Sequence, residues 1–260
     1  MSEALQVAVS AAKTAGKIQR ERNGDIGRIR YKDDINPVTE IDLLCEKEII
    51  KQIRKRFPDH DILAEESAET PTGTSENRWI IDPLDGTVNY AHGYPCYCVS
   101  IALEHKNKVT IGVVYNPSLD ELFVAEKDDG ATLNGKPIHV SSICNMKQSL
   151  LVTGFAYDVA ETDNDNLNHF RNFTKACQAV RRPGSAALDL CYVAMGRFEG
   201  FWELKLHSWD MAAGALLVKE AGGMVSQFDG SSFTVYDREI LATNGLIHNP
   251  MIAILTSGKK

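Results

Sequence analysis

Apolar side chains recur at helical spacing in two stretches near the start of the chain. The first stripe consists of Leu5, Ala8, Ala12, Ala15 and Ile18. Its spacing predicts an amphipathic helix that fades near Asn23. A second helix is predicted from Thr39, which together with Asp42 resembles a capping signal, to the residue before Pro58. The polar residues 28–37 between the two helices predict a mobile loop.

Apolar runs separated by short turn segments predict strands over the next part of the chain. These strands cover residues 61–66, 79–81, 96–104, 109–115 and 121–125. The last three runs are joined by hairpin-length connections, so this part of the sheet is predicted to be antiparallel. Glu65 and Asp82 would then lie at the C-terminal ends of successive strands, where sites on α/β sheets gather. The strand at 79–81 is predicted to stop where Asp82 begins.

Strands and helices alternate in the second half of the chain. Predicted strands cover residues 150–153, 198–204, 224–228 and 240–242, and another strand ends at 181–182. Predicted helices cover about 166–179, 185–196, 208–222 and 247–255. This alternation predicts an α/β second half, with Ser185 and Ser208 as helix caps. The polar segment 141–147 divides the chain into an α+β half, residues 1–145, and an α/β half, residues 146–260.

The composition is ordinary for a soluble globular protein, with 43% hydrophobic and 24% charged residues. The net charge of -7 argues against non-specific binding to nucleic acid or to an anionic membrane, because the protein's own field opposes both. The N-terminus lacks the basic start and apolar centre of a signal peptide, and no uncharged run is long enough to span a bilayer. The six cysteines include no C-x-x-C pair. We therefore expect a cytoplasmic protein that binds no membrane and does not bind nucleic acid directly.

One short stretch, residues 79–89, ends an apolar run in two acids, a proline and a glycine. Asp82 and Asp85 lie three residues apart across a turn, so their carboxylates can converge on one point. Convergent carboxylates repel each other unless a cation lies between them. Thr87 can open a helix whose free N–H groups face an anion. Taken alone, the stretch is equally consistent with an ordinary turn, although its spacing excludes an EF-hand loop and a D-x-D nucleophile.

Acids stand where an element starts or ends in four separate regions of the chain. They are Asp42, Glu65, the pair Asp82 and Asp85, and Asp210. Hard cations prefer oxygen ligands of this kind, and two or three Mg²⁺ ions neutralise the set better than one. Two simpler readings stay open at this stage. Asp42 could serve only as a helix cap, and His207 could lie on the surface rather than orient Asp210.

Several motifs together resemble the inositol monophosphatase family. The motifs are Glu-Glu-Ser at 65–67, Asp-Pro-Leu-Asp-Gly-Thr-Val-Asn at 82–89 and Trp-Asp-Met-Ala-Ala-Gly at 209–214. Pro-Gly-Ser-Ala-Ala-Leu-Asp-Leu at 183–190 and Gly-Phe-Trp-Glu at 200–203 resemble the bacterial branch of that family. The resemblance covers nearly the whole chain. It implies a layered α/β/α/β/α sandwich and an enzyme that hydrolyses a small polyol phosphate, with myo-inositol monophosphate as the leading substrate.

The resemblance also implies a set of metal ligands. Glu65, Asp82 and the Leu84 carbonyl would bind a first Mg²⁺, and Asp82, Asp85 and Asp210 would bind a second. A weaker third ion would lie near Glu65. One metal would sharpen the attacking water and the other would stabilise the leaving alkoxide. The resemblance also implies inhibition by lithium, through competition at the second metal.

The remaining implied roles concern the water, the phosphate and the polyol. Thr87 and Asp42 would assist the attacking water, with Glu65 as a third catalytic residue. The N–H groups of Gly86 and Thr87 would hold the phosphate. The residues matched to inositol contacts are Gly184, Ser185, Ala186 and Glu203, with Asp85 and Asp210 within reach of the hydroxyls. Two positions depart from the family pattern, Ala64 where glycine is frequent and Lys205 where a small or neutral residue is frequent.

Two alternative functions stay open. The same chemistry could act on fructose 1,6-bisphosphate, a 3',5'-bisphosphorylated nucleotide, NADP or histidinol phosphate. A second phosphate needs additional cations, which Lys32, Arg181, Arg182 and Lys205 could supply, whereas Glu203 would repel it. Some bacterial relatives are instead binding partners of the transcription machinery. The family resemblance further implies a homodimer.

Overall fold

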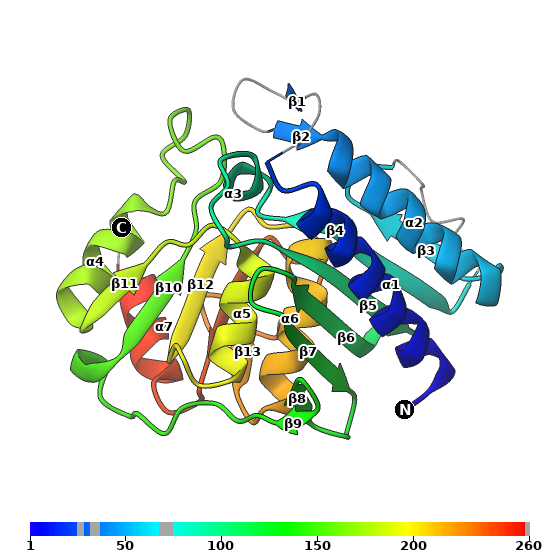
Figure 1. Cartoon of the computed structure of the whole chain (residues 1–260). Helices are drawn as coiled ribbons and strands as arrows, with labels where there is room; N and C mark the ends of the chain where they lie inside the picture. Colours follow the sequence, from blue (N-terminus) through cyan, green and yellow to red (C-terminus); the bar gives the residue numbers. More distant parts are fainter. Residues whose placement is uncertain (25–28, 32–36, 68–74, 258–260) are drawn as a thin grey trace.

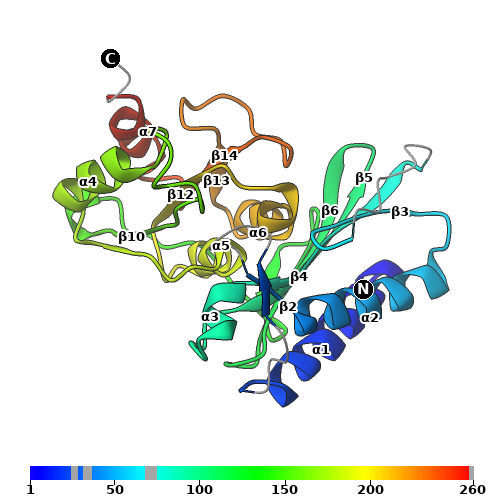
Figure 2. The same cartoon turned by 90° about the horizontal axis from the view of Figure 1, so that it is seen from above.

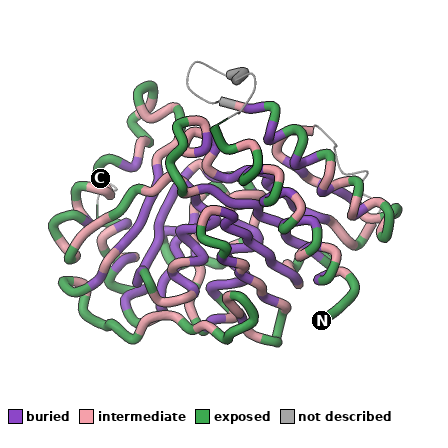
Figure 3. Tube along the Cα trace, in the orientation of Figure 1, coloured by how far each residue is buried: buried purple, intermediate pink, exposed green. Residues whose placement is uncertain are grey.

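The computed structural model describes residues 1–24, 29–31, 37–67 and 75–257 (Figure 1). Two sheets lie on either side of a central pair of helices, and a further pair of helices covers the outer face of each sheet (Figure 2). Buried residues are concentrated in the strands and in the central helices (Figure 3). The arrangement is the α/β/α/β/α sandwich that the family resemblance implied.

The larger sheet has seven strands in the order β3-β4-β5-β6-β7-β8-β9. They are β3 (Asp61–Ala64), β4 (Asn77–Asp85), β5 (Cys98–His105), β6 (Lys108–Asn116), β7 (Glu121–Glu126), β8 (Ala131–Leu133) and β9 (Lys136–Pro137). β3 pairs in parallel with β4, and all later neighbours pair antiparallel. Ala64 at the end of β3 pairs with Ile81, so Glu65 and Asp82 follow paired residues on neighbouring strands, although β4 itself continues to Asp85.

Two long helices cover the outer face of this sheet. They are α1 (Glu3–Glu21) and α2 (Glu40–Arg56). Small alanines on α1 allow it to pack closely against α2 and the sheet, with Trp79 and Ile81 of β4 in the same apolar cluster. α2 begins with the predicted capping box. The Asp42 carboxylate accepts the backbone N–H of Thr39, and the Thr39 hydroxyl oxygen accepts the backbone N–H of Asp42.

The smaller sheet has five strands in the order β11-β10-β12-β14-β13. They are β10 (Leu150–Thr153), β11 (Ala179–Arg181), β12 (Gly200–Leu204), β13 (Met224–Ser226) and β14 (Glu239–Thr243). β11, β10 and β12 are parallel, whereas β14 pairs antiparallel with both β12 and β13. α4 (Leu167–Ala176) and α7 (His248–Thr256) pack on the outer face of this sheet.

The central layer consists of α5 (Ala186–Ala194) and α6 (Ser208–Glu220). Nearly every side chain of these two helices is buried, because one side faces the seven-stranded sheet and the other faces the five-stranded sheet. The short helix α3 (Thr87–Ala91) follows β4. A single 3-10 turn, Met146–Gln148, lies in the segment predicted as the boundary between halves.

The structure corrects four local predictions. Part of the predicted loop at 28–37 forms the antiparallel strands β1 (Ile29–Tyr31) and β2 (Pro37–Thr39), while residues 32–36, including Lys32, lie outside the described part of the chain. β4 does not stop before Asp82 but continues to Asp85, with a break in its pairing to β5. The helix predicted to reach residue 179 ends at Ala176 and is followed by β11. His207, rather than Ser208, is the cap residue of α6.

Among the described residues, none of the helices is long and apolar enough to cross a membrane.

A glycine in β6 provides a test of how closely the central layer packs. A Cβ atom at Gly112 would lie 2.7 Å from the carbonyl oxygen of Ala213 on α6. We expect Gly112→Ala to lower the free energy of unfolding by about 1–3 kcal/mol, because the backbone of α6 must shift. Lys108→Ala, at an exposed position of the same strand, should change it by less than about 0.5 kcal/mol. Equal urea-unfolding midpoints for the two variants would contradict the close contact.

Candidate active site

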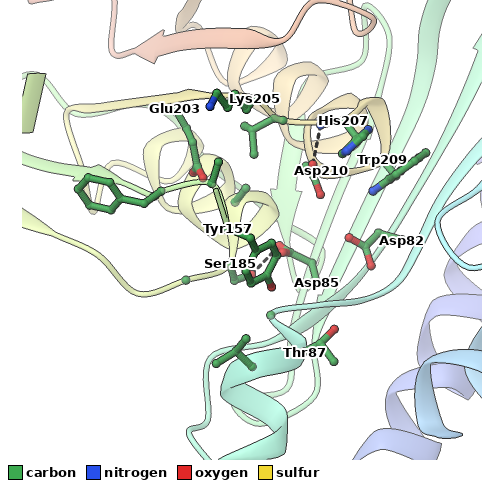
Figure 4. Close-up of a pocket in the computed structure, with 18 of the residues that line it drawn as sticks. Asp82, Asp85, Thr87, Tyr157, Ser185, Glu203, Lys205, His207, Trp209 and Asp210 are labelled. Carbon is green, nitrogen blue, oxygen red and sulfur yellow. Dashed lines mark hydrogen bonds between the residues drawn. The ribbon is translucent and has the colours of Figure 1, made fainter. Parts of the chain in front are cut away.

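A cavity of about 1160 Å³ lies at the ends of β4 and β12, beside the first residues of α3, α5 and α6. The predicted site residues that line it are Glu65, Asp82, Leu84, Asp85, Gly86, Thr87, Gly184, Ser185, Ala186, Glu203 and Asp210. Asp42 is not among the described residues that line the cavity, but it contacts one of them, Thr87. The structure therefore brings together residues that are distant in the sequence and come from both sheets (Figure 4).

The turn at the end of β4 directs two carboxylates to the same side. Pairing with β5 breaks between Asp82 and Asp85, so neither Pro83 nor Leu84 has a paired residue there. The N–H of Leu84 donates to Asp82 Oδ1 at 2.9 Å. Gly86 follows with a φ of 94°, and a Cβ atom at this residue would lie 2.8 Å from a backbone oxygen. This position therefore requires glycine.

Asp210 completes the carboxylate cluster, which we define as Asp82, Asp85 and Asp210. One oxygen of each carboxylate lies within 4.8 Å of the corresponding oxygens of the other two. Asp210 lies in the first turn of α6, where its Oδ2 accepts the N–H of His207 at 2.7 Å. Asp85 Oδ2 accepts the hydroxyl of Ser185 at 2.7 Å and a backbone N–H of α5 at 2.8 Å.

The carboxylate cluster fits a hard cation. Burial raises the pKa of Asp82 well above its usual range, and the neighbouring carboxylates of Glu65, Asp85 and Asp210 raise it further. Burial similarly raises the pKa values of Asp85 and Asp210. The hydrogen bonds given above engage Oδ1 of Asp82, Oδ2 of Asp85 and Oδ2 of Asp210, and each carboxylate has a second oxygen that can ligate a cation. Carboxylate oxygens are the ligands that Mg²⁺ and similar ions prefer.

Asp42 and Thr87 form a polar pair beside the carboxylate cluster. The Thr87 hydroxyl lies 2.9 Å from Asp42 Oδ1 and 3.0 Å from the Leu84 carbonyl oxygen, and it can donate its one proton to either acceptor. Burial raises the pKa of Asp42 to about 6, although hydrogen bonds from Thr39 and Thr87 partly oppose this shift. Asp42 therefore caps α2 and contacts the site at the same time, so the two roles do not exclude each other.

A further buried acid, Glu203, lines the same cavity. Glu203 is near the end of β12, and burial raises the pKa of its carboxyl to about 8, although Arg182 lowers it in part. Gly154 makes room for this carboxylate, because a Cβ atom there would lie within 2.5 Å of its oxygens. Ser185 precedes α5, but its hydroxyl donates to Asp85 instead of capping the helix.

Sequence reasoning missed the loop that follows β10. Tyr157 and Asp158 of this loop line the cavity, and Asp158 forms an ion pair with Lys205, with 2.7 Å between Oδ2 and Nζ. Asp189 was also missed as a site neighbour. It is buried, and burial together with Glu203 and Asp85 raises its pKa well above the usual range. The rule that sites gather at the C-terminal ends of parallel strands could have pointed to this loop, because β10 is parallel to β12.

Comparison with known proteins places this fold and site. The sequence model described as the inositol monophosphatase family matches residues 1–259. The chain belongs to the inositol monophosphatase family. This phosphatase is similar to an inositol-1-monophosphatase of Synechocystis, at 46% identity over 97% of the chain and 88% of the relative. It is also similar to the solved structure of an inositol monophosphatase from Anabaena, with a TM-score of 0.89 and 44% identity over 96% of this chain and 94% of that one.

Another relative carries a different name. The phosphatase is 42% identical to a Nus factor SuhB of Pseudomonas aeruginosa, over 94% of this chain and 92% of the relative. The resemblance to the inositol monophosphatase family is confirmed, and the protein is a phosphoric monoester hydrolase of a metal-dependent family. A role as a binding partner of transcription machinery stays a prediction.

The high pKa of Glu203 has a consequence for stability. Without metal, the folded carboxyl keeps its proton up to about pH 8, whereas an unfolded glutamate releases it near its ordinary value of 4.5. The folded state thus binds more protons between these values, and the free energy of unfolding falls as pH rises from about 5 to 8, by at most about 1.4 kcal/mol per pH unit. Urea unfolding of EDTA-treated protein across this range should show the decline, and Glu203→Gln should make it shallower. An unchanged slope in the variant would assign the effect to other groups.

Proposed function

We propose that this phosphatase hydrolyses phosphate monoesters of small polyols, with myo-inositol monophosphate as its leading substrate and Mg²⁺ bound by the carboxylate cluster. The observation that carries the proposal is the convergence of three buried or half-buried carboxylates, Asp82, Asp85 and Asp210, in a large cavity. Relatives named inositol monophosphatases support the choice of substrate.

The proposed metal ligands are the carboxylate cluster together with Glu65 and the carbonyl of Leu84, all of which line the cavity. Asp82, at the centre of the set, would be shared between two Mg²⁺ ions, and a third would lie near Glu65. Bound there, Mg²⁺ would supply hard positive charge that stabilises the phosphate and the leaving alkoxide. The proposed competition by lithium rests on the same ligands.

Thr87 and Asp42 are proposed to manage the proton of the attacking water. Thr87 lines the cavity, and its hydroxyl can pass a proton toward the Asp42 carboxylate 2.9 Å away. The pKa of Asp42, at about 6, lies near neutral pH, which suits a group that accepts a proton during turnover. The N–H groups of Gly86 and Thr87, at the start of α3, are proposed to contact the phosphate.

Glu203 and the residues before α5 are proposed to bind the polyol. Glu203 presents a buried carboxyl, and hydroxyl groups of a polyol can satisfy it without adding charge. Gly184, Ser185 and Ala186 line the same cavity, and the Ser185 hydroxyl donates to Asp85. A polyol bound here would contact both these residues and the carboxylate cluster.

Among the described residues, three cationic side chains line the cavity, those of Arg182, Lys205 and Arg238, whereas Arg181 does not line it. Two of them already have partners, because Lys205 forms an ion pair with Asp158 and Arg238 donates to the Lys205 carbonyl. Glu203 faces the same space and would repel a second phosphate when ionised. These contacts favour a monophosphate over the bisphosphates considered above. The homodimer and the cytoplasmic location remain predictions.

Removal of one cluster carboxylate tests the metal site. We expect Asp210→Asn to lower kcat/KM for myo-inositol 1-phosphate by roughly 10³-fold, because the amide keeps the shape but loses the charge that holds the metal. Phosphate release measures activity, and calorimetric titration with Mg²⁺ measures metal binding. The matched control is Glu126→Gln, an acid at the far end of β7. Full phosphate release by Asp210→Asn would refute the proposed mechanism.

A panel of substrates tests the proposed specificity. We expect kcat/KM for myo-inositol 1-phosphate to exceed that for fructose 1,6-bisphosphate, adenosine 3',5'-bisphosphate, NADP and histidinol phosphate by at least about 10-fold. Glu203→Gln should raise KM for the inositol ester, and above about pH 8, where the Glu203 carboxyl is ionised, it should reduce the penalty on the bisphosphates. Preference of the wild-type enzyme for any of the bisphosphates would replace the proposed substrate while leaving the chemistry intact.

A further inference from the structure

The apolar stripe of α1 ends in a buried polar side chain. Gln19 lies one helical turn after Ala15 on the buried side of the helix, and none of its surface is exposed. Ile18, which the sequence pattern placed in the stripe, is only half-buried. A glutamine is costly at such a position unless its amide forms good hydrogen bonds. Gln19 Oε1 has no hydrogen-bond partner among the described residues, so an apolar side chain would avoid part of that cost.

The hydrogen bond that Gln19 donates is directed at the turn of the active site. Its Nε2 donates to the carbonyl oxygen of Pro83 at 2.7 Å, across 64 residues of sequence. Pro83 and Leu84 have no paired residue on either neighbouring strand, because pairing with β3 ends at Ile81 and pairing with β5 breaks at this point. The backbone of the turn therefore depends on side chains for its hydrogen bonds.

The bond fixes one peptide group at both of its ends. The carbonyl of Pro83 and the N–H of Leu84 belong to the same planar peptide. Gln19 holds the oxygen, and Asp82 Oδ1 accepts the N–H at 2.9 Å. The amide of Gln19 thus orients the peptide that orients the Asp82 carboxylate, and polarisation along the chain strengthens the second bond.

The end of α1 is tied to the other side of the turn as well. The carbonyl of Gln19 lies in the last turn of the helix, where it lacks an intrahelical partner. It accepts the hydroxyl of Tyr90 at 2.8 Å. Tyr90 belongs to α3, which carries Thr87. One residue of α1 therefore contacts both the segment before Gly86 and the helix after it.

We infer that Gln19 is a positioning residue for the metal site, acting through the peptide between Pro83 and Leu84 on the carboxylate of Asp82. The inference rests on the proposed function, because it assumes that Asp82 binds Mg²⁺. Gln19 does not line the cavity and contacts no substrate. It acts on the affinity for Mg²⁺ rather than on the chemical step.

The test is Gln19→Met, which keeps the length of the side chain and removes the donor. Calorimetric titration of the metal-free full chain with Mg²⁺ should show a dissociation constant raised by about 10–100-fold, as for other groups that hold a metal ligand in place. At saturating Mg²⁺, kcat should return to within about 3-fold of the wild-type value, because Gln19 does not contact the substrate. Hydrogen exchange of the Leu84 amide in the metal-free protein should become faster. Gln6→Met, the same substitution at an exposed position of α1, is the matched control.

An unchanged Mg²⁺ affinity in folded Gln19→Met would overturn the inference and leave the proposed function standing. Gln19→Asn, which is too short to reach Pro83, provides a second variant and should show the same loss of affinity. If both variants lost the native fold, Gln19 would be a residue of the core and the positioning role would be refuted. Failure of the wild-type enzyme to bind Mg²⁺ would instead refute the proposed function, and with it the inference.

Discussion

One carboxylate oxygen each of Asp82, Asp85 and Asp210 lies within 4.8 Å of the other two, and the mutual repulsion of these groups opposes folding. The surrounding structure compensates with hydrogen bonds to one oxygen of each group, from Leu84, from Ser185 and α5, and from His207. Folding alone leaves the three carboxylates repelling one another. A cation bound between them offsets this repulsion, so the arrangement favours cation binding.

The same local device appears on two helices. Asp42 and Asp210 each stand three residues after a helix cap, and each accepts the backbone N–H of that cap through Oδ2. In both cases the capping bond fixes one carboxylate oxygen and leaves the other to face the site. Helix capping and chemistry therefore depend on the same side chain, so substitution of either acid affects local stability as well as activity.

Local patterns in the sequence were sufficient to predict the capping box of α2, the antiparallel hairpins of the larger sheet and the identity of the residues that converge. They were insufficient where a long-range contact decides the outcome. Pro83 predicted the end of a strand, yet β4 continues past it, because its neighbours tolerate a break in pairing. Ser185 predicted a helix cap, yet its hydroxyl is taken by Asp85, 100 residues away in sequence. The ion pair between Lys205 and Asp158 could not be predicted from the sequence, because neither residue belongs to a periodic pattern or a motif that would indicate its partner.

The central helices α5 and α6 supply the core of both sheets, and this arrangement has a consequence for the order in which the molecule can form. A ribosome delivers the seven-stranded sheet complete by Pro137, whereas α6 ends only at Glu220. During that interval α1 and α2 can already cover the outer face of the sheet. Its inner apolar face is still uncovered, because α5 and α6 have not both been synthesised. The nascent chain must therefore shield this face, or delay its formation, until the central helices emerge.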